Sequence, residues 1–273
     1  MKVGITGSKG FIGSVVKNDL IKKKIKLINF DCNLASKKEI QKLIKERGLP
    51  DVLIHFAGRF SNDTSTLIKD NLISTINLLE VFAYNNKNVH IIFSSSGAVY
   101  GDSGKEPINE KHIKTPNTSY GLIKLMCEQT IQYYENLNKC KSTILRFPSV
   151  YGQNNNKGIV YEWISSINKK NEVCIRGDGN QHRSFLDVDD IPIAISKIIE
   201  AEIYGDYNLS NSKPYSLNDL AKIFVEKFKC SIVYKDKDTQ NNLQSMVLSS
   251  EKMKNDLAWY PKKNIESFLD KQV

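Results

Sequence analysis

The sequence predicts an α/β fold built on a doubly wound parallel sheet, followed by a smaller α/β part. Three observations predict this fold. Apolar runs of four to six residues alternate with amphipathic stretches over the first half of the chain, a glycine-rich turn follows the first run, and the alternation becomes irregular after Tyr151. Short apolar runs fit buried strands, and strands separated by helices pair in parallel with helices on both faces of the sheet.

The first half of the chain gives the elements of the parallel sheet in order. The apolar runs predict strands over residues 2–6, 26–30, 52–56, 89–93 and 142–146. The amphipathic stretches between them predict helices over residues 11–23, 36–47, 64–85 and 119–136. Each strand and the helix after it form a right-handed crossover unit.

The remaining chain predicts a second, smaller set of elements. A polar loop over 153–157 precedes a helix over 159–168, a strand over 173–175, a turn over 177–180, a helix over 188–202, a helix over 216–227, a strand over 231–234 and small terminal helices. We therefore expect one domain over 1–152 with about 184–205, and a second over about 153–183 and 206–273.

Composition indicates an ordinary globular protein. The 273 residues are 40% hydrophobic and 25% charged, with a formal net charge of +9. Only five of the 39 basic residues are arginine, and the lysines are scattered, whereas nucleic-acid recognition concentrates its charge and favours arginine. We expect no nucleic-acid partner, although the charge suits anionic small molecules.

The sequence also predicts where the protein resides. The N-terminus, MKVGITGSKG, lacks the apolar segment of a signal peptide, and the longest apolar stretches are too short to cross a membrane. The cysteines are scattered, without a C-x-x-C pair, which is typical of a reducing compartment. We expect a cytoplasmic protein without membrane partners.

The turn after the first strand carries glycines at positions 7, 10 and 13. Gly7 permits the tight turn, Gly10 lets the backbone approach a diphosphate, and Gly13 lets the helix pack closely. The helix beginning with Phe11 and Ile12 offers free N–H groups to phosphates. This spacing, after a strand and before a helix, predicts a dinucleotide site.

Two types of dinucleotide fit the end of the second predicted strand. Asp31 stands where an acidic side chain accepts hydrogen bonds from the adenosine ribose of NAD, with Asn33 and Leu34 placed to meet the adenine. Lys9, inside the glycine turn, offers a cation to the 2′-phosphate of NADP. The residues leave the choice between NAD and NADP open.

The fourth predicted strand leads into a cluster of hydroxyl groups at Ser94–Ser96, where open α/β sheets bind their ligands. The next helix opens with Tyr120 and Lys124, which lie four residues apart and therefore on one helical face. A phenol and an ammonium group facing one site predict acid/base chemistry.

These motifs together resemble those of the extended short-chain dehydrogenase/reductases, in the nucleotide-sugar branch of the NAD-dependent epimerase/dehydratase family. The resemblance runs from Thr6 to about Asn208. It rests on the glycine turn, IHFAG at 54–58, Asn71, SSSGAVYG at 94–101, Tyr120 with Lys124, LRFPSVYG at 145–152 and RGDGNQHRSF at 176–185.

The resemblance implies a Rossmann domain, a substrate-binding second domain, and hydride transfer at a carbon of a nucleotide-diphosphate sugar. Tyr120 is then the acid/base, Lys124 favours its phenolate and binds the nicotinamide ribose, and Ser96 holds the reacting oxygen. The resemblance adds cofactor contacts at Phe56, Ala57, Gly58, Asn71 and Phe147, and substrate contacts at Ser96, Ser149 and Arg183.

Several alternatives stay open at this point. An epimerase and a 4-keto reductase use serine, tyrosine and lysine identically, so the sequence does not separate them. The other readings are a non-catalytic NAD(P)-binding regulator and a reductase of a non-nucleotide carbonyl compound. We expect no metal, because His55 and His182 have no paired ligands and Asp187, Asp189 and Asp190 are interpreted as helix caps.

A homodimer is also predicted. The expected helices over 64–85 and 119–136 carry apolar residues on more than one side. Members of the family pair these two helices across a two-fold axis, which gives a four-helix interface.

Overall fold

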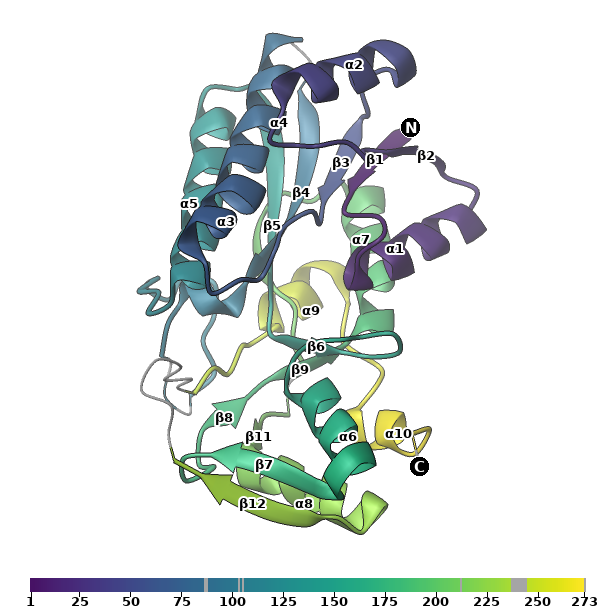
Figure 1. The fold of residues 1–273 in the computed structure, drawn as a ribbon. Helices are drawn as coiled ribbons and strands as arrows, with labels where there is room; N and C mark the ends of the chain where they lie inside the picture. The colour runs from purple at the N-terminus through teal and green to yellow at the C-terminus, as the bar shows by residue number, and fades with distance from the viewer. Residues whose placement is uncertain (86–87, 103, 105, 212, 237–244, 273) are drawn as a thin grey trace. The chain divides into compact units, whose positions relative to one another are not determined.

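The computed structural model describes residues 1–85, 88–102, 104, 106–211, 213–236 and 245–272. Contacts divide the chain into two compact units (Figure 1). The first unit comprises Met1–Tyr100, Ile113–Arg146 and Ile191–Tyr207, and the second Gly101–His112, Phe147–Asp190 and Asn208–Val273. Residues 101–112, 147–152 and 184–190, which we expected in the first domain, thus group with the second unit.

The first unit is built on a mainly parallel sheet with the strand order β10-β5-β4-β3-β1-β2. β1 pairs in parallel with β2 and β3, and β3 pairs in parallel with β4. The strands are β1 (Lys2–Thr6), β2 (Lys26–Asn29), β3 (Val52–His55), β4 (Val89–Ser96), β5 (Cys140–Phe147) and β10 (Gly205–Asn208). The predicted strands are all present; β4 extends three residues further, to Ser96, and β10 was not expected.

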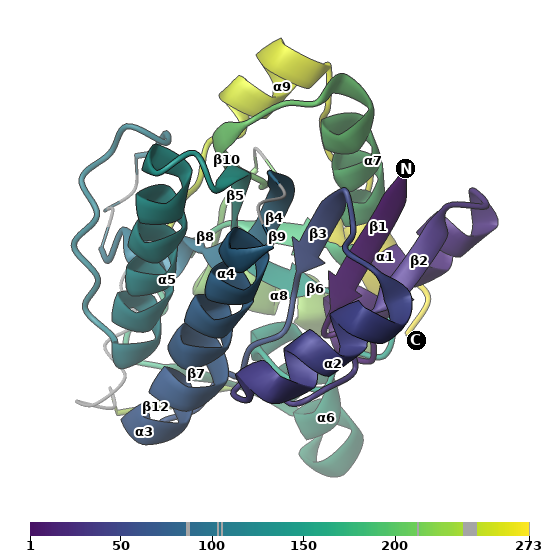
Figure 2. The same cartoon turned by 90° about the horizontal axis from the view of Figure 1, so that it is seen from above.

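Helices cover both faces of this sheet, which confirms the predicted doubly wound fold. They are α1 (Phe11–Lys22), α2 (Lys37–Arg47), α4 (Ser74–Tyr84), α5 (Ser119–Asn136) and α7 (Ile191–Ala201). α2, α4 and α5 lie over one face, and α1 packs beside α7 over the other (Figures 1 and 2).

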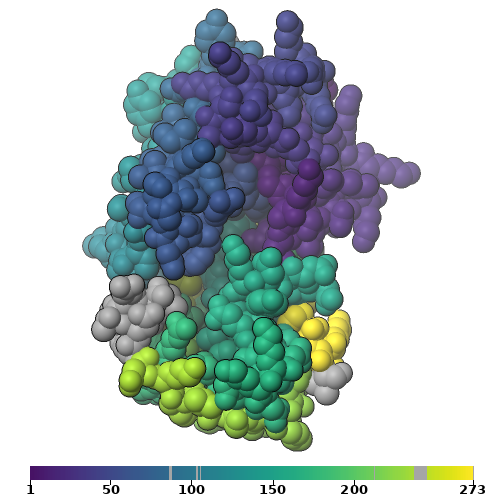
Figure 3. Space-filling model, viewed as in Figure 1, coloured from purple at the N-terminus to yellow at the C-terminus, as the bar shows by residue number. Residues whose placement is uncertain are grey.

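The burial pattern of α2 shows why its sequence forms a covering helix. Ile40, Leu43 and Ile44 recur at helical spacing and are buried, whereas Lys42 and Lys45 are exposed. The helix lies at the surface of the first unit, in the dark blue part of Figure 3. The buried face joins a core that contains Phe30 and Phe82.

The helix expected over 64–85 is not a continuous α-helix. It consists of α3 (Thr64–Leu67), a π-helical segment η1 (Ile68–Ile73) and α4. The hydroxyl of Ser74 donates to the carbonyl oxygen of Lys69, and that of Thr75 donates to the carbonyl oxygen of Asn71 at 2.7 Å. Such side-chain bonds to nearby carbonyls accompany the widened turn, which hydrophobic periodicity does not reveal.

The second unit combines short strand pairs with helices. β6 (Ser149–Tyr151) pairs with β9 (Phe185–Asp187) and β7 (Glu172–Arg176) with β12 (Ser231–Lys235), both in parallel; β8 (His182–Arg183) pairs with β11 (Tyr215–Ser216) in antiparallel fashion. Its helices include α6 (Ile159–Lys170), α8 (Leu217–Phe228), α9 (Glu251–Leu257) and α10 (Ile265–Leu269). The core of this unit includes Trp163 and Phe224, whose rings meet edge to face.

Within the described residues, no helix combines the length and the apolar character needed to cross a membrane.

Candidate active site

The turn between β1 and α1 depends on glycines that let two backbone segments come close. Gly7 has a φ of 65°, and a Cβ on it would lie 2.7 Å from the backbone nitrogen of Ala57. A Cβ on Gly13 would lie 2.1 Å from the carbonyl oxygen of Gly7. Glycine is therefore required at both positions, for the turn itself and for seating α1 against it.

The same turn leaves the N-terminus of α1 open. Gly10 is the N-cap residue and has no side chain to cap the N–H groups of Phe11, Ile12 and Gly13. A Cβ on Gly10 would meet only the carbonyl oxygen of Gly7, at 3.2 Å. Uncapped N–H groups beside an open backbone surface suit a diphosphate, so the turn fits the dinucleotide predicted from the sequence.

Asp31 lies beside this turn. The Ser8 hydroxyl donates to its Oδ1 at 3.0 Å, and the ammonium group of Lys9 lies 3.7 Å from its Oδ2. The Lys9 side chain is 82% exposed, so the ion pair holds it weakly. A carboxylate suited to a ribose and a cation suited to a 2′-phosphate therefore stand together, and their contact with NAD or NADP remains a prediction.

Asn33 and Leu34 were both predicted to meet the adenine, but their side chains have different surroundings. The Oδ1 of Asn33 accepts a hydrogen bond from the N–H of Ala35 at 3.1 Å, which forms a tight turn. Leu34 is buried in the core of the first unit. Contact of either residue with a cofactor remains a prediction, and for Leu34 it would involve the backbone.

Asn71 shapes the segment that follows β3. Its Nδ2 donates to the carbonyl oxygens of Arg59 and Leu67, and its Oδ1 accepts the N–H of Arg59 at 3.2 Å. A Cβ on Gly58 would lie 2.5 Å from that Oδ1. The Asn71 amide therefore fixes the loop after Phe56, and its direct contact with a cofactor remains a prediction.

His55 connects the ends of three elements. The Thr75 hydroxyl donates to the Asn71 carbonyl oxygen, so it accepts from the Nε2–H of His55 at 3.1 Å. Nδ1 then accepts from the Thr6 hydroxyl at 2.7 Å, and Thr6 accepts the N–H of Ala57. Burial lowers the pKa of His55 to about 3. This neutral, fully bonded ring has the structural role predicted from the sequence.

The three predicted catalytic residues lie where α5 meets the end of β4. A Cβ on Gly121, next to Tyr120, would lie 2.4 Å from the carbonyl oxygen of Ala98, so α5 begins directly against η2 (Gly97–Val99). The Nζ of Lys124 donates to the carbonyl oxygen of Ser94 at 2.8 Å. Ser96 accepts the N–H of Ala98 through its Oγ at 3.2 Å, and within the described residues its own hydroxyl proton has no acceptor.

The electrostatics of Tyr120 differ from the expectation that Lys124 favours its phenolate. Burial raises the pKa of Tyr120 to about 12, and burial also lowers the pKa of Lys124. The ammonium group lies 5.9 Å from the centre of the Tyr120 ring and is bonded to Ser94 instead. In the protein alone, desolvation therefore keeps the phenol of Tyr120 protonated at neutral pH.

A buried polar group that was not predicted from the sequence lies next to these residues. Ser95 donates to Glu128, and Glu128 forms a bidentate ion pair with Arg146. One signal was available, because Glu128 continues the four-residue spacing of Tyr120 and Lys124 along α5. The pairing with Arg146 on β5 depends on the tertiary fold and has no local sequence signal.

Of the predicted substrate residues, Ser149 and Arg183 belong to the second unit, whereas Ser96 ends β4 in the first. Ser149 is half-buried in β6, and Phe147, which was predicted to contact the cofactor, is buried at the start of the second unit. Arg183 in β8 is only 7% exposed, and its Nη2 has no hydrogen-bond partner within the described part of the chain. Burial lowers the pKa of its guanidinium to about 10. A buried cation with an unused donor suits an anionic ligand.

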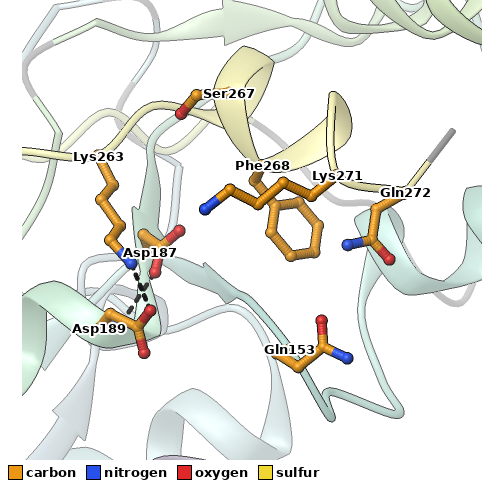
Figure 4. Close-up of a pocket in the computed structure, with 8 residues that line it drawn as sticks. All are labelled: Gln153, Asp187, Asp189, Lys263, Ser267, Phe268, Lys271 and Gln272. Carbon is orange, nitrogen blue, oxygen red and sulfur yellow. Dashed lines mark hydrogen bonds and ion pairs between the residues drawn. The ribbon is translucent and has the colours of Figure 1, made fainter.

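A separate pocket of about 150 Å³ lies in the second unit and contains none of the predicted site residues (Figure 4). The N–H of Asp189 bonds to the carboxylate of Asp187 at 2.9 Å, which is the predicted capping role. The Asp190 carboxylate does not cap α7; it accepts the N–H groups of Lys262 and Lys263. Among the described residues, no group of three or more His, Cys, Asp or Glu side chains is arranged to hold a metal ion.

Comparisons with known proteins identify the family of this chain. A model of the NAD dependent epimerase/dehydratase family matches residues 3–210. The chain belongs to this family. The resemblance inferred from the sequence motifs is thereby confirmed.

Relatives of this epimerase/dehydratase family member include enzymes for different sugar nucleotides. The dTDP-4-dehydro-6-deoxyglucose reductase of Escherichia coli is 23% identical over 98% of this chain and 95% of its own length. The solved UDP-glucose 4-epimerase of Thermotoga maritima, bound to UDP-glucose, is 25% identical, with a TM-score of 0.88 over 99% of this chain and 96% of that one.

A further structural neighbour, RMD of Pseudomonas aeruginosa in complex with NADPH, has a TM-score of 0.86 at 21% identity, over 99% of this chain and 97% of that one. At that identity the likeness concerns the fold alone. The family and the relatives are NAD(P)-dependent epimerases, dehydratases and reductases, which confirms the predicted enzyme class.

Proposed function

We propose that this chain is an NAD(P)-dependent epimerase or 4-keto reductase of a nucleotide-diphosphate sugar, with Tyr120 as the acid/base. The observation that carries the proposal is the junction of α5 with β4. There the ammonium of Lys124 is fixed on the Ser94 carbonyl at 2.8 Å, and Tyr120 and Ser96 come from the same two elements. The glycine turn of the same unit supports the cofactor.

Tyr120, Ser96 and Lys124 have different roles in the proposed proton transfer. Tyr120 gives a proton to the sugar oxygen when a carbonyl is reduced and takes one when an alcohol is oxidised. Ser96 donates a hydrogen bond from its hydroxyl to the same oxygen and stabilises the charge that develops there. Bound in its oxidised form, a nicotinamide cofactor would supply a hydride acceptor and a positive charge. Lys124 adds a second cation, which favours the phenolate during oxidation.

The second unit supports a substrate with a diphosphate. Arg183 is buried, and its Nη2 is unpaired within the described residues, so an anion would satisfy both its charge and its donor. Guanidinium groups bind phosphate oxygens in a bidentate manner. The named relatives act on UDP-linked and dTDP-linked sugars, which supports the same substrate class for this chain.

The proposal includes a homodimer in the cytoplasm. A shallow apolar groove on α4, α5 and η1 is lined by Leu72, Ile76, Met126, Gln129, Thr130 and Tyr133. Leu122 and Met126, on α5, are 49% and 38% exposed although apolar. A second copy offering the same face would cover these side chains. The free thiols of all five cysteines suit a reducing compartment.

The deciding experiment is a turnover assay on the purified protein and on Tyr120→Phe. Both are first examined by absorbance for bound cofactor, then incubated with UDP-sugars and dTDP-4-keto sugars, with and without added NADH or NADPH. An epimerase converts a sugar without consuming reduced cofactor, whereas a reductase oxidises one equivalent per product.

We expect Tyr120→Phe to bind the cofactor normally and to lose at least about 100-fold in kcat, the lower end for acid/base catalysis. Cofactor binding without turnover of any sugar would favour a non-catalytic regulator. Reduction of simple ketones or aldehydes alone would favour a non-nucleotide substrate.

A further inference from the structure

The first unit holds a buried ion pair that the proposed chemistry does not use. Arg146 on β5 and Glu128 on α5 are 0% and 1% exposed, with Nε–Oε1 and Nη2–Oε2 distances of 3.0 and 2.8 Å. Arg146 also donates to the Tyr100 hydroxyl at 2.8 Å and to the Asp206 carboxylate. Apolar side chains of similar volume often stabilise a fold as well as a buried ion pair does, so this pair suggests a role in specifying geometry.

The ion pair is bonded to the end of β4. The Ser95 hydroxyl donates to Oε1 of Glu128 at 2.5 Å. Ser95 stands between Ser94, whose carbonyl accepts the Lys124 ammonium, and Ser96, the proposed donor to the sugar oxygen. The carboxylate of Glu128 thus holds the residue that lies directly between the Ser94 carbonyl and the Ser96 hydroxyl, the two groups that β4 contributes to the site.

The spacing along α5 connects the same carboxylate to the acid/base. Tyr120, Lys124 and Glu128 follow one another at intervals of four residues, so they form one stripe on the helix. Two members of that stripe are bonded to β4, Lys124 through the Ser94 carbonyl and Glu128 through the Ser95 hydroxyl. Two bonds one helical turn apart fix both the height and the rotation of α5 relative to the strand.

We propose that Glu128 is a positioning residue for the reaction. Held by Arg146, its carboxylate fixes Ser95 and thereby sets the Ser94 carbonyl and the Ser96 hydroxyl in register with Lys124 and Tyr120. This inference rests on the proposed function, because its catalytic consequence requires Tyr120 and Ser96 to act on one oxygen. Displacements of about 1 Å in such constellations cost about 100-fold in rate.

The chain offers a matched pair of variants for the test. Ser95→Ala removes the bond from β4 to Glu128 and leaves the Glu128–Arg146 pair intact. Ser142→Ala is the control, because Ser142 is equally buried on β5 and donates to another carboxylate of α5, Glu135, at 2.8 Å. Glu135 lies fifteen residues beyond Tyr120, far along the helix from the proposed site.

We expect Ser95→Ala to lower kcat about 10- to 100-fold, with the KM for sugar nucleotide and the Kd for cofactor within about twofold of wild type. Ser142→Ala should keep kcat within about twofold. Both variants should lower the thermal midpoint to a similar extent. A similar loss of kcat in both variants, or none in Ser95→Ala, would overturn the proposal.

A second readout does not depend on turnover. Crystal structures of both variants should show the Lys124–Ser94 hydrogen bond lost in Ser95→Ala and kept at about 2.8 Å in Ser142→Ala. If the wild type converts no nucleotide sugar while this bond is lost only in Ser95→Ala, the proposed function fails and the positioning contact stands. An unchanged bond in Ser95→Ala, with an active wild type, refutes the positioning role alone.

Discussion

His55 illustrates how one buried side chain makes stability depend on pH. Its ring is 1% exposed, donates from Nε2 to Thr75 and accepts at Nδ1 from Thr6. Protonation of Nδ1 would break the second bond and place a charge in the core. Burial accordingly lowers the pKa of His55 to about 3, against about 6.5 in the unfolded chain.

Replacing His55 should make the free energy of unfolding fall less steeply as the pH is lowered below 6.5. Between pH 6.5 and about 3 the unfolded chain binds a proton that the folded one does not, so the stability lost is about 1.4 kcal/mol per pH unit. From pH 7 to pH 5, wild type should therefore lose about 2 kcal/mol more than His55→Gln, measured by urea unfolding. The decline left in His55→Gln includes that from His90, whose pKa burial lowers to about 4. Equal acid slopes in both proteins would contradict a neutral His55.

Arg183 offers a contrasting test at the residue scale. Arg183→Met removes a buried cation, so the free protein should not lose stability, whereas substrate binding loses a contact worth about 1.5–3 kcal/mol. The KM for nucleotide sugar should rise about 10- to 150-fold with little change in cofactor affinity. Arg47→Met, at an exposed arginine of α2, is the control. A destabilised Arg183→Met with normal KM would show a purely structural role.

Single residues of the site were predictable where one helix or one turn determines their geometry. Tyr120 and Lys124 share a face because α-helical spacing requires it. The contact of Lys124 with the Ser94 carbonyl and the ion pair between Glu128 and Arg146 were not predictable. Both join elements that are far apart in the sequence, and neither leaves a local pattern.

At the scale of the element, the β1–α1 turn contains two glycines that are needed for different physical reasons. Gly13→Ala would place a Cβ 2.1 Å from the Gly7 carbonyl oxygen, so the helix must move. Gly10→Ala meets the same oxygen at 3.2 Å, which needs only a small adjustment. Gly13 is therefore needed for the packing of α1, and Gly10 keeps the surface of the turn open to a ligand.

We therefore expect Gly13→Ala to lower the free energy of unfolding by at least about 1–3 kcal/mol, as overpacking does. Gly10→Ala should stay within about 1 kcal/mol of wild type and still weaken NAD(P) binding, because its methyl group covers the N–H groups of α1. Chemical unfolding and fluorescence titration with NADH measure the two effects. Normal cofactor affinity in a folded Gly10→Ala protein would refute the phosphate site.

Elements were predictable in proportion to their length and regularity. α5 was predicted at its observed bounds and β1 likewise, because β1 is a short apolar run ending at a glycine turn and α5 is a long stretch rich in apolar residues. The π-helical segment η1 depends on the hydroxyl bonds of Ser74 and Thr75 and escaped prediction. β8 and β11 span two residues each and are too short to show an alternation.

At the scale of the whole molecule, the two units differ in how well their strand arrangement could be predicted from the sequence. The first unit repeats a strand and a helix, so its sheet order follows from crossover rules and the position of the glycine turn. The second unit is held by strand pairs between segments such as β7 and β12, which lie more than fifty residues apart. Pairings of this kind depend on tertiary packing, which no local pattern specifies.

The exposed apolar groove on α4, α5 and η1 predicts that two copies of the chain assemble through this face. Met126 lines this groove and is 38% exposed, so Met126→Glu should leave the chain folded while placing a charge opposite its symmetry mate. Light scattering at micromolar concentration should give twice the 31.0 kDa chain mass for wild type and a single mass for Met126→Glu.

Ile21→Glu is the matched control for this prediction. Ile21 is 53% exposed on α1, which covers the opposite face of the sheet, so this variant should remain a dimer. Because Tyr120 and Lys124 begin the same helix α5 that carries Met126, the monomeric variant also shows whether catalysis needs the interface. A wild type that scatters as a monomer, or a dimer that Met126→Glu leaves intact, would refute this interface.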